Sequence, residues 1–110
     1  MNSKKKGDAG ERELLHLLED RGIDCRRNQQ GLLAGFCGGK GNPDILARIG
    51  GRELHVECKR TERFALYSAL DQAQRDAAET AAIPVVAHRM NRRPWVVVLS
   101  LDDFLGLMEG

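Results

Sequence analysis

Apolar side chains recur at helical spacing in two parts of the chain, and a capping residue marks a third helix. In the first part, Leu14, Leu15 and Leu18 form one stripe, and Asp8 followed by Glu11 matches a capping box, which together predict a helix over residues 9–21. An alanine-rich stretch with the same spacing predicts a second helix over residues 64–82. A cap at Ser100 predicts a third helix that ends near residue 108.

Short apolar segments between these helices have the composition and alternation of strands. They predict strands at residues 23–28, 44–49, 52–59, 84–88 and 95–99, whereas the glycine-rich stretch 29–42 predicts a loop. This order of helix, strands, helix, strands and helix indicates a single α/β domain over residues 1–110. We expect a central mixed β-sheet flanked by helices, with a flexible basic tail over residues 1–7.

The pair Gly50-Gly51 suits a two-residue hairpin turn between the second and third predicted strands. A tight turn makes the numbers of facing residues sum to 101, so Ile45 faces Val56 and Asp44 faces Glu57. Alternation then gives the hairpin one apolar face for the core. The other face is left for chemistry or solvent, and it carries Asp44, Arg48, Glu53, His55, Glu57 and Lys59.

The facing carboxylates of Asp44 and Glu57 point to a metal ion. Carboxylates about 5 Å apart repel each other unless a cation lies between them. Mg²⁺ prefers oxygen ligands and commonly uses one or two carboxylates, with waters and substrate phosphate. Lys59 lies on the same face, where its ammonium can orient an attacking water. An ordinary surface ion pair between Glu57 and Lys59 would explain those two residues alone, but not the three together.

Pro43-Asp44 and Glu57-Cys58-Lys59 resemble the signature of the PD-(D/E)XK nuclease superfamily. The opening Gly10-Glu11-Arg12-Glu13 and the run HVECKR further resemble archaeal-type Holliday junction resolvases and their phage relatives. The resemblance implies a restriction-endonuclease-like core and hydrolysis of phosphodiester bonds in branched DNA, namely four-way junctions. It also implies a homodimer with Mg²⁺ as cofactor, for which Mn²⁺ substitutes. The metal ligands that it implies are Glu11, Asp44, Glu57 and the backbone carbonyl of Cys58, and the catalytic residues are Glu11, Asp44, Glu57 and Lys59.

Further residues would support such a site. Glu11 lies on the leucine side of its helix, so its carboxylate should point to the body of the domain, although the capping box also explains it. Arg26 or Arg27 resembles a basic residue near the scissile phosphate, and either fits. Gln74, with Gln72 as an alternative, resembles a supporting glutamine of the superfamily. The resolvases tend to have a serine in the following loop, which residues 29–41 lack.

Composition limits the other functions. The net charge is only +1, so a nucleic-acid surface must come from local clusters. The clusters assigned to DNA binding are Lys4, Lys5, Lys6, Arg26, Arg27 and Lys40, and a further cluster, Arg89, Arg92 and Arg93, is left unassigned. No apolar run is long enough for a membrane, and no secretory signal or disulfide framework is recognised, which favours the cytoplasm of a prokaryotic, archaeal or phage-infected cell. Ala34 and Gly41 break a phosphate-loop pattern, so no nucleotide cofactor is expected.

Two other functions stay open at this stage. A nuclease of the same superfamily that acts on flaps, nicks or plain duplex would need the same catalytic residues. A non-catalytic DNA-binding subunit with this fold is disfavoured because Asp44, Glu57 and Lys59 are all retained.

Overall fold

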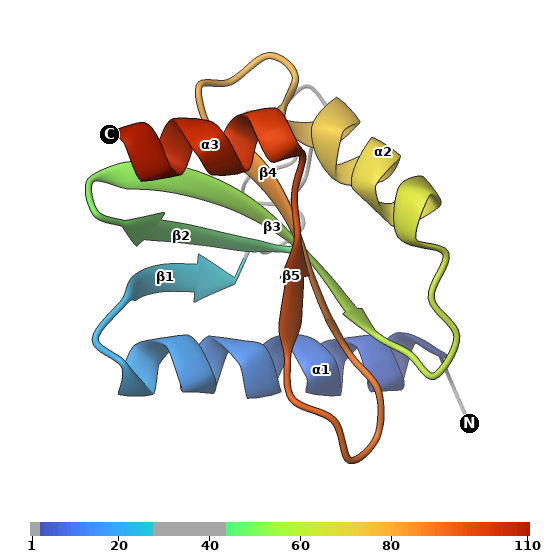
Figure 1. Cartoon of the computed structure of the whole chain (residues 1–110). Helices are drawn as coiled ribbons and strands as arrows, with labels where there is room; N and C mark the ends of the chain where they lie inside the picture. The colour runs from blue at the N-terminus through green and yellow to red at the C-terminus, as the bar shows by residue number, and fades with distance from the viewer. Residues whose placement is uncertain (1–2, 28–43) are drawn as a thin grey trace.

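The computed structural model of the chain describes residues 3–27 and 44–110. Within these residues the strands form one five-stranded sheet in the order β1-β2-β3-β4-β5, in which β3 and β4 pair parallel and the other neighbours pair antiparallel. The mixed sheet flanked by helices is confirmed (Figure 1). None of the helices in the described residues is long and apolar enough to cross a membrane. In chain order the elements are α1 (Ser3–Asp20), β1 (Asp24–Arg27), β2 (Ile45–Ile49), β3 (Arg52–Arg60), α2 (Leu66–Ala77), β4 (Ile83–Arg89), β5 (Val96–Val98) and α3 (Leu101–Glu109).

The predicted hairpin register is confirmed. Ile45 pairs with Val56 and Ile49 pairs with Arg52 across the antiparallel β2–β3 ladder. Gly50 and Gly51 form the turn with φ angles of 59° and 78°, a region that glycine adopts without steric cost. The residue before β2, Asp44, therefore lies beside the segment of β3 that holds Glu57.

Each face of the sheet is covered by a different helix. On one face α1 places Leu14 against Ile45, Ala47, Val56 and Ala87, which together form the larger buried cluster. On the opposite face α2 packs Ala69, Leu70 and Ala73 against Val86. Because side chains alternate along a strand, the residues of β3 that flank Val56 face α2.

Two helix boundaries differ from the predicted ones. α1 begins at Ser3 rather than near residue 9, so residues 3–7, predicted as a tail, are helical and Asp8 is not at the helix start. Lysine favours helix, which accounts for the longer element. α2 ends at Ala77 rather than near residue 82 because Thr80 replaces the helical hydrogen bonds: its hydroxyl donates to the Ala77 carbonyl and accepts from the Ala82 amide.

At Gly10 the backbone of α1 lies very close to the sheet. A Cβ at this position would be 2.5 Å from the Cβ of Arg60 and 3.8 Å from the sulfur of Cys58. A real Cβ contact does not reach 2.5 Å, so only glycine allows this approach. The helix is thereby held against β3 at the residue that precedes Glu11.

Candidate active site

Asp44 is fixed by the backbone of the neighbouring strand. Its Oδ2 accepts a hydrogen bond of 2.8 Å from the backbone N–H of Cys58, and the residue is half-buried. Burial raises the pKa of Asp44 to about 6, although the Cys58 N–H opposes the shift, and the nearby Glu11 carboxyl raises it further. The carboxyl is therefore held in place but is costly to ionise without a cation.

Glu57 is a buried carboxylate with an unused oxygen. Its side chain is only 5% exposed, Oε2 lies 3.7 Å from Lys59 Nζ, and Oε1 is buried with no hydrogen-bond partner among the described residues. Burial, followed by the charge of Asp44, raises the pKa of Glu57 to about 7, and Lys59 opposes this shift. An unpartnered buried oxygen of this kind costs free energy, which a bound cation would recover.

Glu11 lies near Asp44 and Glu57, but its carboxylate is paired with Arg27. Arg27 Nε donates to its Oε1 at 2.6 Å, which joins α1 to the end of β1. Glu11 also raises the pKa of Asp44 and Glu57, so the three carboxyls influence one another. In residues 3–27 and 44–110, however, no three His, Cys, Asp or Glu side chains are arranged as a complete set of metal ligands.

The donors at this site suit a hard divalent ion. Asp44 and Glu57 supply carboxylate oxygens, and Mg²⁺ commonly takes one or two protein carboxylates with waters for the rest. Burial raises the pKa of the Cys58 thiol to about 12, and its side chain packs against the apolar cluster around Leu14, which leaves oxygen atoms as the donors at the site. The residues present therefore fit magnesium better than zinc.

The face of the hairpin that carries these groups is not open to solvent along its length. His55, Glu57 and His88 are all buried, since α2 covers this side of β3 and β4. His88 stacks on Phe64 with ring centroids 4.0 Å apart, and its Nε2 lies 2.9 Å from the Thr61 carbonyl oxygen. His88 is thus a structural residue that joins β4 to the segment after β3.

Asp76, on α2, lies near Glu57, and its place at this site was not predicted from the sequence. Its charge raises the pKa of Glu57, and burial raises its own pKa. The same helix shows Gln72 half-buried and Gln74 exposed, so the position predicted for the supporting glutamine faces solvent. The signal that was available is the helical spacing: positions 69, 73 and 76 share the face that meets the sheet.

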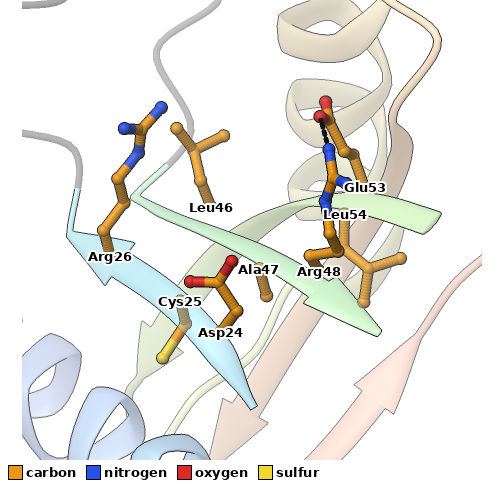
Figure 2. Close-up of a pocket in the computed structure, with 8 residues that line it drawn as sticks. All are labelled: Asp24, Cys25, Arg26, Leu46, Ala47, Arg48, Glu53 and Leu54. Atoms are coloured by element: carbon orange, nitrogen blue, oxygen red, sulfur yellow. Dashed lines mark hydrogen bonds and ion pairs between the residues drawn. The ribbon is translucent and has the colours of Figure 1, made fainter. Parts of the chain in front are cut away.

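The basic residues that were predicted to bind DNA do not all lie at the carboxylate site. Arg27 binds Glu11 at the site, whereas Arg26 is exposed and lines a hollow of about 260 Å³ over β1, β2 and β3 (Figure 2). The hollow contains none of Glu11, Asp44, Glu57 or Lys59, so it is separate from the carboxylate site. Lys40 lies outside the described residues, and Lys4, Lys5 and Lys6 belong to α1. The lining residues are Asp24, Cys25, Arg26, Leu46, Ala47, Arg48, Glu53 and Leu54.

Comparisons with known proteins show the family and the fold of the chain. The model of a family described as "Phage putative PDDEXK endonuclease" matches residues 2–109. Among solved structures, the fold is similar to that of Hjc, a Holliday junction resolvase from the archaeal hyperthermophile Archaeoglobus fulgidus, with a TM-score of 0.62 and 26% sequence identity. The match covers 81% of this chain and 72% of the resolvase chain. No curated protein matches the chain.

Proposed function

Since this chain belongs to the phage PDDEXK endonuclease family, we propose that it is a magnesium-dependent, structure-selective DNA endonuclease that cuts Holliday junctions. The observation that carries the proposal is the buried pair of Asp44 and Glu57, with one Glu57 oxygen unpartnered and Lys59 beside the other. The similarity to an archaeal Holliday junction resolvase supports four-way junctions as the substrate.

The metal would be held by Asp44, Glu57 and the backbone carbonyl of Cys58. When bound, Mg²⁺ would lower the pKa of a coordinated water and neutralise charge on the phosphate. Asp44 is kept at its position by the Cys58 N–H, and Glu57 by the rigid β3–β4 pairing around Val86. Lys59, whose Nζ is 3.7 Å from Glu57, can donate to a phosphate oxygen or to the attacking water.

Arg27 and Glu11 complete the proposed site from the α1 side. Their 2.6 Å ion pair keeps the guanidinium next to the carboxylates, a position from which an arginine can bind a phosphate. Arg27 is therefore assigned as the residue nearest the scissile phosphate, in preference to Arg26. Mn²⁺ is expected to substitute for Mg²⁺ because it accepts the same oxygen ligands.

Cleavage of a labelled four-way junction tests this function. In Mg²⁺ we expect paired, symmetric cuts in the junction and no comparable cutting of a linear duplex with the same arm sequences, because phosphate contacts read backbone shape rather than base edges. The products are resolved on denaturing gels, with flap and nicked substrates in parallel. Equal cleavage rates on duplex or flap DNA would support a nuclease function but contradict junction selectivity. DNA binding without cleavage in Mg²⁺ or Mn²⁺ would contradict a nuclease function altogether.

Symmetric cutting needs two active sites, and a homodimer is part of the proposal. Its support is an exposed apolar surface at the C-terminal end of the chain. β5 is an edge strand with Val96 and Val97 exposed, and α3 follows it directly. The buried clusters of the described residues contain no α3 residue. Four apolar α3 side chains share one helical stripe and are exposed, namely Leu101, Phe104, Leu105 and Met108.

A second copy of the chain fits this surface because both of its parts, an edge strand and an apolar helical stripe, can contact the same part of another copy. Two edge strands can pair antiparallel about a twofold axis, which would also bring the two α3 stripes together. We expect Phe104→Glu with Met108→Glu to yield a monomer at micromolar concentration, since each charge would be placed in an apolar contact. Sedimentation equilibrium measures this, with Tyr67→Glu, an exposed aromatic on α2, as the matched control. A wild-type monomer, or an unchanged dimer in the double variant, would contradict the assignment.

A further inference from the structure

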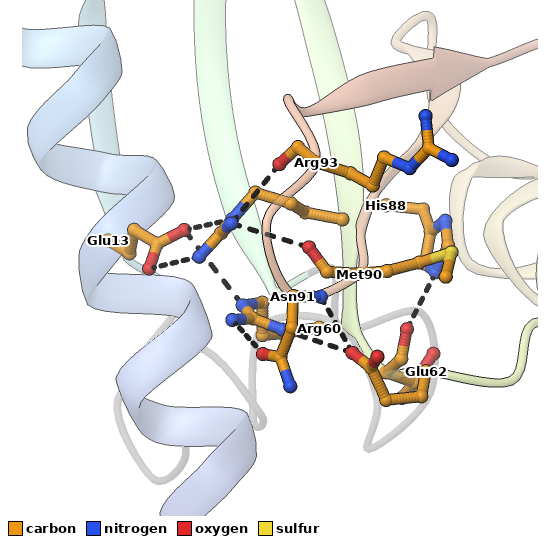
Figure 3. Close-up of polar contacts among 9 residues, drawn as sticks. Glu13, Arg60, Glu62, His88, Met90, Asn91 and Arg93 are labelled. Carbon is orange, nitrogen blue, oxygen red and sulfur yellow. Dashed lines mark hydrogen bonds and ion pairs between the residues drawn. The ribbon is translucent and has the colours of Figure 1, made fainter.

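The turn between β4 and β5 is unusually well anchored for an exposed loop. Arg89, the last residue of β4, binds both Glu13 oxygens, with distances of 2.6 and 3.2 Å. Its Nη1 also donates to the carbonyls of Met90 and Arg93 at 3.3 and 3.1 Å, so one guanidinium joins α1 to both sides of the turn. Figure 3 shows Glu13 of α1 facing this network.

The turn is also tied to the end of β3. Arg60 Nη2 donates to Asn91 Oδ1 at 2.6 Å, and the Asn91 N–H donates to Glu62 Oε2 at 2.7 Å. Lys59 is the residue before Arg60, and Arg92 is the residue after Asn91. The hydrogen bond between Arg60 and Asn91 therefore links the neighbour of Lys59 to the neighbour of Arg92. Because β3 and β4 are parallel, their carboxyl ends lie at the same end of the sheet. The turn and the carboxylate site therefore share that end.

Two arginines of this turn have no acidic partner among residues 9–27 and 44–110. Arg92 and Arg93 are both exposed, and no salt bridge of the described residues includes them. The local acids, Glu13 and Glu62, are already engaged by Arg60 and Arg89. With two glutamates against four arginines, the turn carries two uncompensated positive charges.

Arg92 also has a backbone conformation that is rare for its residue type. Its φ is 64°, and within the described residues it is the one non-glycine residue with a positive φ. A long side chain here costs free energy relative to glycine, and such costs tend to persist where function requires the side chain. Arg92 therefore occupies a position where the backbone favours glycine or asparagine.

We propose that Arg92 and Arg93 bind backbone phosphates of the DNA substrate outside the active site. The same DNA molecule would place its scissile phosphate at Asp44 and Glu57. The inference rests on the proposed function for its ligand. The anchoring by Arg89 and Arg60 fixes the backbone of the turn, from which both arginines project, relative to the end of β3 that holds Lys59. The contact is to phosphates and is independent of base sequence.

Salt-dependent binding of a labelled four-way junction in EDTA, without cleavage, tests the contact. Each phosphate contact contributes about 0.9 to the slope of log Kd against log salt. Arg92→Gln with Arg93→Gln should therefore lower the slope by about 2 and weaken binding about tenfold or more at 0.1 M salt. The matched control removes the same charge elsewhere: Arg21 and Arg75, both exposed, replaced together by Gln. An unchanged slope in the turn variant, or an equal loss in the control, would overturn the inference.

A second variant separates binding from folding. Arg92→Gly should raise the melting temperature, because glycine suits a φ of 64°, while it lowers the slope by about 1. A structural role for the arginine predicts the reverse, a lower melting temperature with the slope unchanged. If wild-type protein bound neither junction nor duplex, the proposed function would fail as well. If it bound and cut normally while both turn variants matched it, only the phosphate contact would fail.

Discussion

Glu57→Gln is expected to lower the rate of DNA cleavage in Mg²⁺ by on the order of 10³-fold, with little change in DNA affinity. Glutamine keeps the size of the side chain but replaces an anionic metal ligand with a neutral amide. Glu57 Oε1 is buried and unpartnered, so the charge that is lost is the one that faces the proposed cation. Single-turnover cleavage of a four-way junction gives the rate, and binding in EDTA gives the affinity.

The matched control for this prediction is Glu53→Gln. Glu53 is on the same strand and the same face, but it is exposed and pairs with Arg48 at 2.7 Å near the opposite end of the hairpin. Its replacement should leave the cleavage rate within about twofold, because surface ion pairs contribute little. A Glu57→Gln protein that cuts at the wild-type rate would remove this carboxylate from the mechanism.

Without metal, the free energy of unfolding is expected to fall as pH rises from about 4 to about 7, and Mg²⁺ should recover part of the loss. The pKa values of Asp44 and Glu57 are raised by burial, to about 6 and about 7. In this window the folded protein keeps protons that the unfolded chain has released, so deprotonation favours unfolding. For the pair the loss is on the order of 6 kcal/mol, and it is complete above pH 7.

Urea unfolding in EDTA at several pH values measures this loss, and a parallel series contains Mg²⁺. Metal at a hundred times its Kd should add about 2.7 kcal/mol at pH 8. Asp44→Asn with Glu57→Gln should flatten the fall between pH 4 and 7 and remove the effect of Mg²⁺. A wild-type protein whose stability rises over this window, or that gains as much from Mg²⁺ as the double variant does, would contradict the assigned metal pair.

Local patterns predicted the hairpin and its register, because Gly50-Gly51 and strict alternation leave few other pairings. The same local reasoning could not predict what covers each face. The polar face of β3 was expected to meet solvent or substrate, yet α2 buries His55 on it. That outcome depends on the β3–α2–β4 crossover, which no short window contains. The start of α1 was missed because a recognised cap at Asp8 was preferred over the helix propensity of the lysines before it.

Among the site residues, contacts within the hairpin could be predicted from the sequence, whereas contacts between distant segments could not. Asp44 and Glu57 were placed together correctly by counting from one turn, as the hydrogen bond from Cys58 to Asp44 spans only 14 residues. The Arg27–Glu11 and Arg89–Glu13 pairs span 16 and 76 residues, and no sequence period relates them. The choice between Arg26 and Arg27, and the anchoring of the β4–β5 turn, therefore needed the three-dimensional structure.

The order of the sheet has a consequence for how the chain folds. Strands β1, β2 and β3 are antiparallel neighbours, with β2 and β3 joined by a two-residue turn, whereas β3 and β4 are joined only through α2. Short loops close faster than long ones, so the β2–β3 hairpin is expected to form early and the parallel β3–β4 contact late. The two opposed carboxylates would then meet while still hydrated, before α2 docks. Divalent ions should accordingly accelerate the late docking step more than the hairpin step.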